Sequence, residues 1–169
     1  MREIDRAELI DGIYRLVDGA LILEELHLDV GGWPPGEPEG SVTYLEGCVD
    51  RGGAAWGAFD AERLVGIAVL DGRRIGPALD TLDLFFLHVG NGYRGRSIGR
   101  ALVDLVRSAA LGMGAWRLYV SASETRNTVE FYQRLGFGLA SEVDAELFAM
   151  EPNDIHMDLA LSSRLPTGS

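Results

Sequence analysis

Apolar and polar residues follow two different patterns along the chain, and the pattern changes near residue 80. Before that point, apolar runs are broken by turn residues and predict two hairpins. The first has arms at 14–17 and 20–30 around Asp18-Gly19, a pair that tolerates the left-handed backbone angles of a tight turn. The second has arms at 54–59 and 63–70. We also predict a strand followed by a helix over 2–13, and a helix over 41–51 ended by Gly52-Gly53.

After residue 80, apolar strands alternate with amphipathic helices. The pattern predicts strands at 81–89, 115–121, 137–143 and 155–161, and helices at 98–113 and 125–135. A strand, a helix and a further strand imply a parallel pair joined by a right-handed crossover. Because antiparallel hairpins precede this unit, we expect a mixed sheet and an α+β fold.

Length and composition place the whole chain, residues 1–169, in one domain. The apolar fraction of 47% is enough for a core without disulfides or metals. Residues 31–40 are rich in proline and glycine and are expected to form a surface loop, and residues 162–169 are expected to form a frayed tail. Cys48 is the lone cysteine, so an internal disulfide is excluded, and no Cys/His pair has zinc spacing. The charged start and the lack of a long apolar run favour a mature cytoplasmic protein.

The charge composition excludes several classes of function. The net charge is −11, and all 15 basic residues are arginines, so the chain contains no lysine. A Schiff-base enzyme and a Walker-type phosphate loop both need a lysine ammonium and are therefore excluded. So acidic a chain also repels nucleic acid, whereas a cationic or neutral partner is easier to accommodate.

Residues 94–100, Arg-Gly-Arg-Ser-Ile-Gly-Arg, carry the clearest chemical signal. They join a predicted strand to a predicted helix, and a helix start presents unpaired N–H groups and partial positive charge. Gly95 and Gly99 allow close approach to the backbone, and no acidic residue occurs between positions 84 and 103. The segment therefore predicts a phosphate or diphosphate site. The alternative is an ordinary turn with solvated arginines and Ser97 as the N-cap of the helix.

The spacing of this segment resembles the acyl-CoA loop of the GNAT superfamily of N-acetyltransferases, whose pattern is Gln/Arg-x-x-Gly-x-Gly/Ala. Arg94 fills the first place and Gly99 the last, while Ser97 stands where the family usually has glycine. Residues 130–137, Glu-Phe-Tyr-Gln-Arg-Leu-Gly-Phe, resemble a second signature of the family. Together the two motifs and their strands cover residues 82–143, which the resemblance makes the acyl-CoA-binding core.

The resemblance implies a mostly antiparallel sheet with helices on both faces and a splayed parallel strand pair that binds coenzyme A. It implies direct transfer of acetyl from acetyl-CoA to a primary amine of a small molecule or peptide, with no metal, and it allows a homodimer. The residues expected to bind the cofactor are Leu87, His88, Val89, Arg94, Gly95, Arg96, Ser97, Ile98, Gly99, Arg100, Thr125, Asn127 and Tyr132. Thr125 occupies the place where the family often has asparagine. Asn127 is a CoA contact or, alternatively, a helix N-cap paired with Glu130.

The resemblance also suggests catalytic roles. Tyr132 would be the general acid that protonates the thiolate, unless it only packs near the helix end. Asp83 would be the general base, acting through water. The rival base is His88, which strand alternation places on the opposite face. No base is needed if the amine arrives uncharged.

Residues 1–53 would then form the acceptor side. Glu24, Glu25 and His27 lie on the predicted hairpin, where an acidic lining would attract a cationic amine. Trp33 would either close over a substrate or serve as a buried anchor. Two other functions stay open, an acyl-CoA-binding sensor without turnover and a nucleotide-binding protein.

Overall fold

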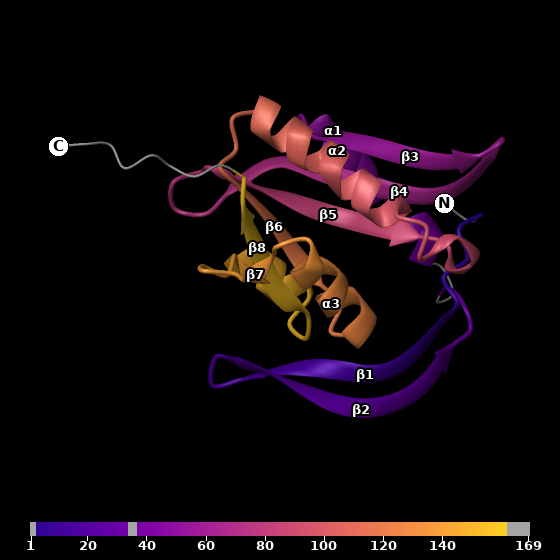
Figure 1. Ribbon diagram of the computed structural model, residues 1–169. Coiled ribbons are helices and arrows are strands. Elements are labelled where there is room, and N and C mark those ends of the chain that lie inside the picture. Colours follow the sequence, from indigo (N-terminus) through magenta and orange to yellow (C-terminus); the bar gives the residue numbers. More distant parts are fainter. Residues whose placement is uncertain (1–2, 34–36, 162–169) are drawn as a thin grey trace.

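Six strands form one mixed sheet in the order β3-β4-β5-β6-β8-β7 (Figure 1). The computed structural model describes residues 3–33 and 37–161. Strands β5 and β6 run parallel, and the other neighbouring pairs run antiparallel, which confirms the α+β class. The strands are β3 (Ala54–Asp60), β4 (Arg63–Ile75), β5 (Thr81–Val89), β6 (Arg117–Ala122), β7 (Gly138–Leu139) and β8 (Ile155–Ala160).

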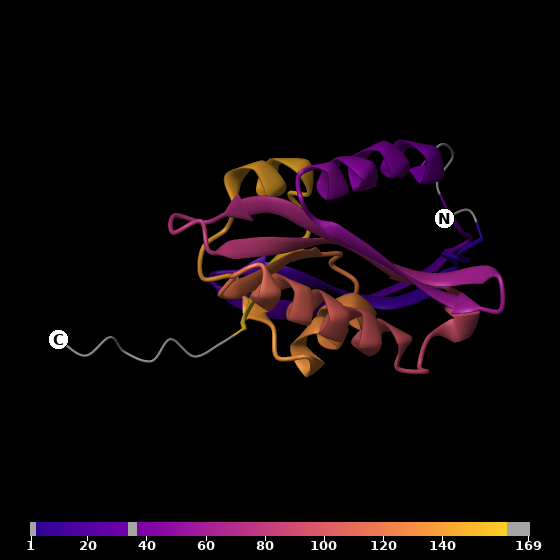
Figure 2. The same cartoon turned by 90° about the horizontal axis from the view of Figure 1, so that it is seen from above.

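Helices cover both faces of the sheet (Figure 2). On one face lie α1 (Glu37–Asp50) and the short α4 (Ala145–Met150). On the other lie α2 (Ile98–Gly112) and α3 (Arg126–Arg134). The main core forms between α2, α3 and the sheet, because α2 buries Leu102, Val103 and Val106 at helical spacing against strand residues such as Leu84 and Leu118.

A separate hairpin of β1 (Glu8–Val17) and β2 (Ala20–Val30) lies beside α3 (Figure 1). Its turn confirms the prediction, since Asp18 and Gly19 both have positive φ, at 49° and 79°. The hairpin is attached through a backbone hydrogen bond from the N–H of Tyr14 to the carbonyl of Glu124, at 2.8 Å. The predicted helix within 2–13 is wrong, because residues from Glu8 onward pair with β2 as a strand.

The bounds of several elements differ from the sequence prediction. Helix α1 begins at Glu37, within the segment expected to be a loop, of which residues 34–36 lie outside the described residues. The strand expected over 137–143 is reduced to β7, and α4 follows it. Asp144 starts α4, because its carboxylate accepts the N–H groups of Glu146 and Leu147. The expected tail, residues 162–169, also lies outside the described residues. None of the described helices has the length and hydropathy needed to cross a bilayer.

The parallel strands β5 and β6 separate part-way along their length. Their pairing runs only from Thr81 to Asp83 on β5, and the following residues of β5, 84–89, have no partner on β6. The strands diverge beyond this point (Figure 1). This edge of β5 therefore presents backbone N–H and C=O groups toward a gap.

A bulge in β5 decides which side chains face which side. Val69 pairs with Phe86 but Leu70 pairs with Leu84, so one extra residue is inserted on β5. Beyond the bulge, Leu87 packs in the core under α2, while the rings of Phe86 and His88 contact Trp33 on the side of α1. Asp83 and His88 thus face the same side. The expectation that they lie on opposite faces is wrong, because it assumed uninterrupted alternation.

Candidate functional site

Helix α2 begins with uncapped backbone amides. Gly95 and Ser97, which precede it, both have positive φ, at 73° and 63°. Ser97 occupies the N-cap position, yet its side chain makes no capping hydrogen bond. The first backbone bond of the helix runs from the N–H of Ala101 to the carbonyl of Ser97. Within the described residues, no hydrogen bond uses the N–H groups of Ile98, Gly99 and Arg100, which leaves them available to an anion.

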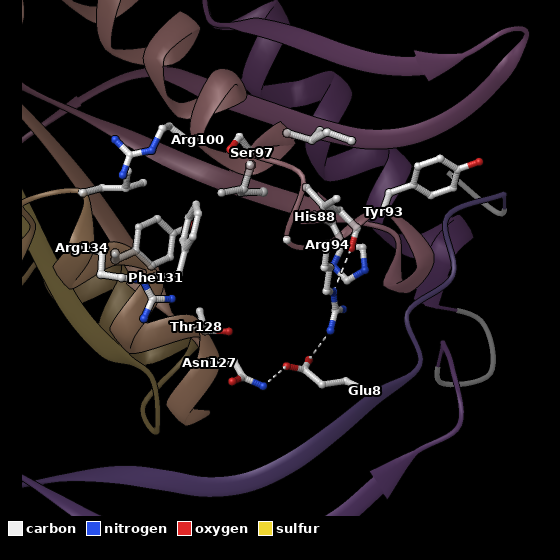
Figure 3. A pocket seen from close by; sticks show the side chains of 17 residues that line it. Glu8, His88, Tyr93, Arg94, Ser97, Arg100, Asn127, Thr128, Phe131 and Arg134 are labelled. Carbon is white, nitrogen blue, oxygen red and sulfur yellow. Dashed lines mark hydrogen bonds and ion pairs between the residues drawn. The ribbon is translucent and has the colours of Figure 1, made fainter.

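These amides lie at a cleft of about 620 Å³, here called the loop cleft, between the end of β5 and α3 (Figure 3). Three arginines line it, Arg94, Arg100 and Arg134, together with one acid, Glu8. Gly99 fits closely here, because a Cβ atom at this position would approach the ring of Phe131 to 3.2 Å and the ring would have to shift. In a strongly acidic chain, the loop cleft is therefore a local excess of positive charge.

Arg94 ties the loop to its surroundings. Its Nε donates a hydrogen bond to the carbonyl of Val89, at 3.1 Å, and its Nη1 lies 3.5 Å from Oε2 of Glu8. Within the described residues Arg100 makes no ion pair, so its guanidinium is available to a ligand in the loop cleft. The two arginines thus have different roles, since one orders the loop and the other is free to bind.

A second cleft, of about 550 Å³, lies on the α1 side of β5 and is here called the α1 cleft. Its charge is opposite to that of the loop cleft. Four acids line it, Glu8, Asp83, Glu151 and Asp154, against a single arginine, Arg6. Burial, and then the neighbouring Glu151, raise the pKa of Asp154 to about 6. A cation entering this cleft would stabilise these carboxylates.

The two clefts meet where β5 separates from β6. Five residues line both of them, namely Glu8, Leu87, His88, Thr128 and Tyr132. A molecule in the loop cleft and a molecule in the α1 cleft can therefore come into contact at this junction. Any reaction between them would take place among these five side chains.

Tyr132 is the predicted acid, and the structure places it at the junction. Its ring is buried and packs edge-on against Phe131 and Phe137, with centroids 5.2 Å apart in each pair. Burial, and then the nearby Asp83, raise the pKa of its hydroxyl above the usual range of a phenol. The hydroxyl consequently keeps its proton at neutral pH and can serve as a donor.

Asp83, the predicted base, lines the α1 cleft and is 3% exposed. Its Oδ1 is buried with no hydrogen-bond partner within the described part of the chain. Burial, and then repulsion by Asp71, raise the pKa of this carboxyl to about 8. A carboxyl with this pKa can exchange a proton near neutral pH, which is the property that general acid–base chemistry needs.

His88 is much less basic. Burial, and then the charges of Arg94 and Arg6, lower the pKa of its ring to about 4. The ring is therefore neutral at pH 7 and a poor proton acceptor. It lies against the indole of Trp33 in a tilted arrangement, with ring centroids 5.3 Å apart.

The predicted acceptor residues separate into two groups. Trp33 lines the α1 cleft, and its indole N–H is fixed by a hydrogen bond to the carbonyl of Ile4, at 2.7 Å. Glu24, Glu25 and His27 lie exposed on β2 and line neither cleft. The hairpin contributes Glu8, from the start of β1, in their place.

Of the residues predicted to bind the cofactor, all but Arg96 and Thr125 line the loop cleft. Arg96 lies over the ring of Tyr93, and Thr125 is buried at the start of α3, with its hydroxyl bonded to Thr128. The alternative that Asn127 caps this helix is wrong, because Thr125 holds the N-cap position. Asn127 instead donates to Glu8, at 3.4 Å.

Sequence reasoning missed several lining residues. Phe131 and Arg134 belong to the recognised signature, so their positions beside Tyr132 were a usable signal. Thr128 lies one helical turn before Tyr132 and shares its face of α3. Glu8 had no sequence signal at all, since only the tertiary attachment of the hairpin brings it to the clefts.

Comparison with known proteins agrees with this geometry. Residues 22–137, more than half of the chain, match the model of the acetyltransferase (GNAT) family. The chain belongs to this family. An uncharacterised N-acetyltransferase of Shouchella clausii is 40% identical over 65 residues, which cover 38% of this chain and 35% of that protein. The chain thus matches about a third of the length of this curated relative.

Solved structures of GNAT proteins share the fold. Nourseothricin acetyltransferase matches with a TM-score of 0.66 and 20% identity, over 94% of this chain and 89% of that one. A protein of Bacillus anthracis assigned as a streptothricin acetyltransferase, solved with acetyl coenzyme A, matches with a TM-score of 0.62 and 16% identity, over 94% and 88%. The GNAT fold of this chain is a mixed, mostly antiparallel sheet with one parallel pair.

Proposed function

We propose that this GNAT protein transfers an acetyl group from acetyl-CoA to a primary amine, by direct attack while both substrates are bound. The observation that carries the proposal is the pair of clefts of opposite charge that meet at Tyr132. The cationic loop cleft suits a diphosphate, and the acidic α1 cleft suits a protonated amine. Family membership supports acetyl transfer, and one similar structure with acetyl coenzyme A bound supports the choice of cosubstrate.

The residues of the loop cleft fit coenzyme A. The uncapped amides at the start of α2, together with Arg100, would bind the diphosphate. The unpaired edge of β5, residues 84–89, would hydrogen-bond the pantetheine arm as a neighbouring strand does. When bound, the cosubstrate supplies the acetyl thioester at the junction of the clefts.

Two side chains of the protein would then donate and accept the protons of the reaction. Once the ammonium has lost one proton, the acceptor nitrogen would form the new C–N bond, the C–S bond would break, and the sulfur would leave as a thiol with a proton from the hydroxyl of Tyr132. The nitrogen would lose its second proton on becoming an amide, and this proton would restore the hydroxyl of Tyr132. Asp83 would take the proton that the ammonium must lose, through water, once its carboxyl is ionised. His88 is disfavoured as the base, because its lowered pKa makes it a weak proton acceptor.

The acceptor is proposed to be a cationic amine of a small molecule or peptide. This rests on the acids of the α1 cleft, because the similarity to proteins named for nourseothricin and streptothricin is too low to transfer an acceptor. An anionic acceptor would be unfavourable there, because its negative charge would be buried beside Asp83 and Asp154 without an opposite charge to balance it. Arg6, stacked on Trp33, lines the same cleft.

A panel of primary amines, assayed for release of free CoA thiol, tests the proposal. We expect turnover with at least one cationic amine, and binding of acetyl-CoA by calorimetry. Binding without thiol release for every amine would identify an acyl-CoA-binding module in place of an enzyme. No heat with acetyl-CoA would contradict both functions.

Tyr132→Phe tests the role of the acid. Because only the proton donor is lost, kcat should fall about 100-fold or more, while the Kd of acetyl-CoA stays within about twofold. Tyr14→Phe is the matched control, since its hydroxyl contacts Glu130 and it lines neither cleft. An unchanged kcat in the Tyr132 variant would refute the acid role.

A further inference from the structure

Glu8 occupies a place that no motif of the sequence indicates. It begins β1, and the hairpin brings it to the point where the loop cleft and the α1 cleft meet. Among the described residues it is the one carboxylate that lines both clefts. Its side chain reaches between the loop and the start of α3 (Figure 3).

The contacts of Glu8 leave its carboxylate able to accept more hydrogen bonds. Oε2 lies 3.5 Å from a guanidinium nitrogen of Arg94, and Oε1 accepts from the amide of Asn127 at 3.4 Å. Both contacts are long for a charge-assisted hydrogen bond. An ionised carboxylate can accept about four hydrogen bonds, so much of its capacity is unused. Its side chain is 19% exposed, so a ligand in the clefts can reach it.

The other side chains at the junction do not provide a negative charge. Leu87 is apolar, and Thr128 and Tyr132 carry hydroxyls. His88 is neutral, because its pKa is lowered to about 4. Asp83 lies in the α1 cleft alone, and with a pKa of about 8 it is largely protonated at pH 7.

We propose that Glu8 binds the ammonium group of the acceptor and holds its nitrogen at the junction of the two clefts. This inference rests on the proposed function, because it assigns the residue that positions the nucleophile for that same reaction. One N–H of the ammonium would point to the carboxylate of Glu8. The proton to be lost would remain free to leave toward the α1 cleft, where Asp83 lies.

The experiment compares Glu8→Gln with the unaltered protein, on two kinds of acceptor at pH 7. One is the best cationic amine of the panel, and the other is benzhydrazide, a neutral nucleophile. Loss of a charged hydrogen bond should lower kcat/KM for the cationic amine by about 10- to 100-fold, mainly through KM. The value for benzhydrazide and the Kd of acetyl-CoA by calorimetry should stay within about threefold. Glu8→Asp should restore part of the loss.

A control variant and the pattern of losses separate a role in acceptor binding from a structural role. Asp11→Asn removes an acid from the same strand outside both clefts, and should leave every parameter unchanged. If Glu8 only attached the hairpin to Arg94 and Asn127, its replacement would weaken acetyl-CoA binding and slow both acceptors equally, and that result overturns the inference. An unchanged kcat/KM for the cationic amine overturns it too. If the unaltered protein turns over no amine while binding acetyl-CoA, the proposed function fails first.

Discussion

As the proposed general base, Asp83 would give the activity a characteristic dependence on pH. Its pKa is raised to about 8, first by burial and then by Asp71. A base acts only when ionised, so kcat/KM should increase as the pH rises through about 8 and then level off. Asp83→Asn should lower kcat and abolish this limb. If kcat/KM of the variant still rises near pH 8, the rise is due to the ionisation of another group, such as the amine itself.

The burial that raises the pKa of Asp83 also lowers the free energy of unfolding at pH values where the carboxyl would otherwise be ionised. An unfolded aspartate ionises near pH 4, whereas folded Asp83 resists ionisation until about pH 8. The unfolded state therefore binds fewer protons between these values, and folding stability should fall as the pH rises through this window. Asp83→Asn should unfold at higher denaturant concentration than the unaltered protein, with the difference growing from pH 5 to pH 8. A constant difference would contradict the raised pKa.

At the scale of single residues, the place of a residue in a cleft could be predicted only where the residues that mark it lie close to it in the sequence. The places of Ser97, Gly99 and Tyr132 in the loop cleft were predictable, because the motif residues that mark them lie within a few positions along the chain. Glu8 and Trp33 reach the clefts through the hairpin and through β5, so their roles depend on contacts distant in sequence. A pattern of neighbours holds no information about such contacts.

At the scale of elements, helix α2 begins from a strained residue. Ser97 has φ 63° and ψ 8°, a left-handed conformation that costs a residue with a Cβ about 1 kcal/mol. Ser97→Gly should raise the free energy of unfolding by up to about 1 kcal/mol, because relief of strain exceeds the entropy added to the unfolded chain. The Kd of acetyl-CoA should stay within about threefold, since the amides are unchanged.

Ser97→Val and Leu79→Gly complete this test by denaturant unfolding. A β-branched side chain tolerates left-handed angles poorly, so Ser97→Val should destabilise the protein. Leu79 has a similar φ of 50° in a turn outside both clefts, so Leu79→Gly should stabilise the protein without any effect on ligand binding. If Ser97→Gly were destabilising, the hydroxyl would have a structural contact beyond those described.

Two of the wrong predictions, the helix within 2–13 and the face of His88, share one cause. The polar and apolar residues of 8–13 are compatible with either a helix or a strand. Only the pairing with β2, which the local sequence does not show, makes this segment a strand. The bulge in β5 is likewise set by register with β4, and it moves His88 to the face of Asp83. Helices α2 and α3 and strand β5 were predicted to within a few residues, because their periodicity is strong over their whole length.

At the scale of the whole molecule, the sheet separates two chemical environments. The chain carries a net charge of −11, yet the loop cleft on one side of β5 has three arginines and one acid. The α1 cleft on the other side has four acids and one arginine. The splay of β5 from β6 joins the two clefts, so in the proposed function the fold would separate the two substrates by charge and still allow them to meet.

Binding of the cosubstrate should therefore stabilise the whole molecule and protect particular segments. At a ligand concentration 100 times its Kd, CoA should add about 2.7 kcal/mol, which raises Tm by roughly 5 to 10 °C for a domain of this size. Amide hydrogen exchange should slow at residues 94–101 and along residues 84–89 of β5, while the exposed strand β2 should change little. ADP, which carries the diphosphate without the pantetheine arm, should protect the loop but leave the edge of β5 exchanging as before. Equal protection of both segments by ADP would indicate a nucleotide site, and would contradict pantetheine binding in the gap between β5 and β6.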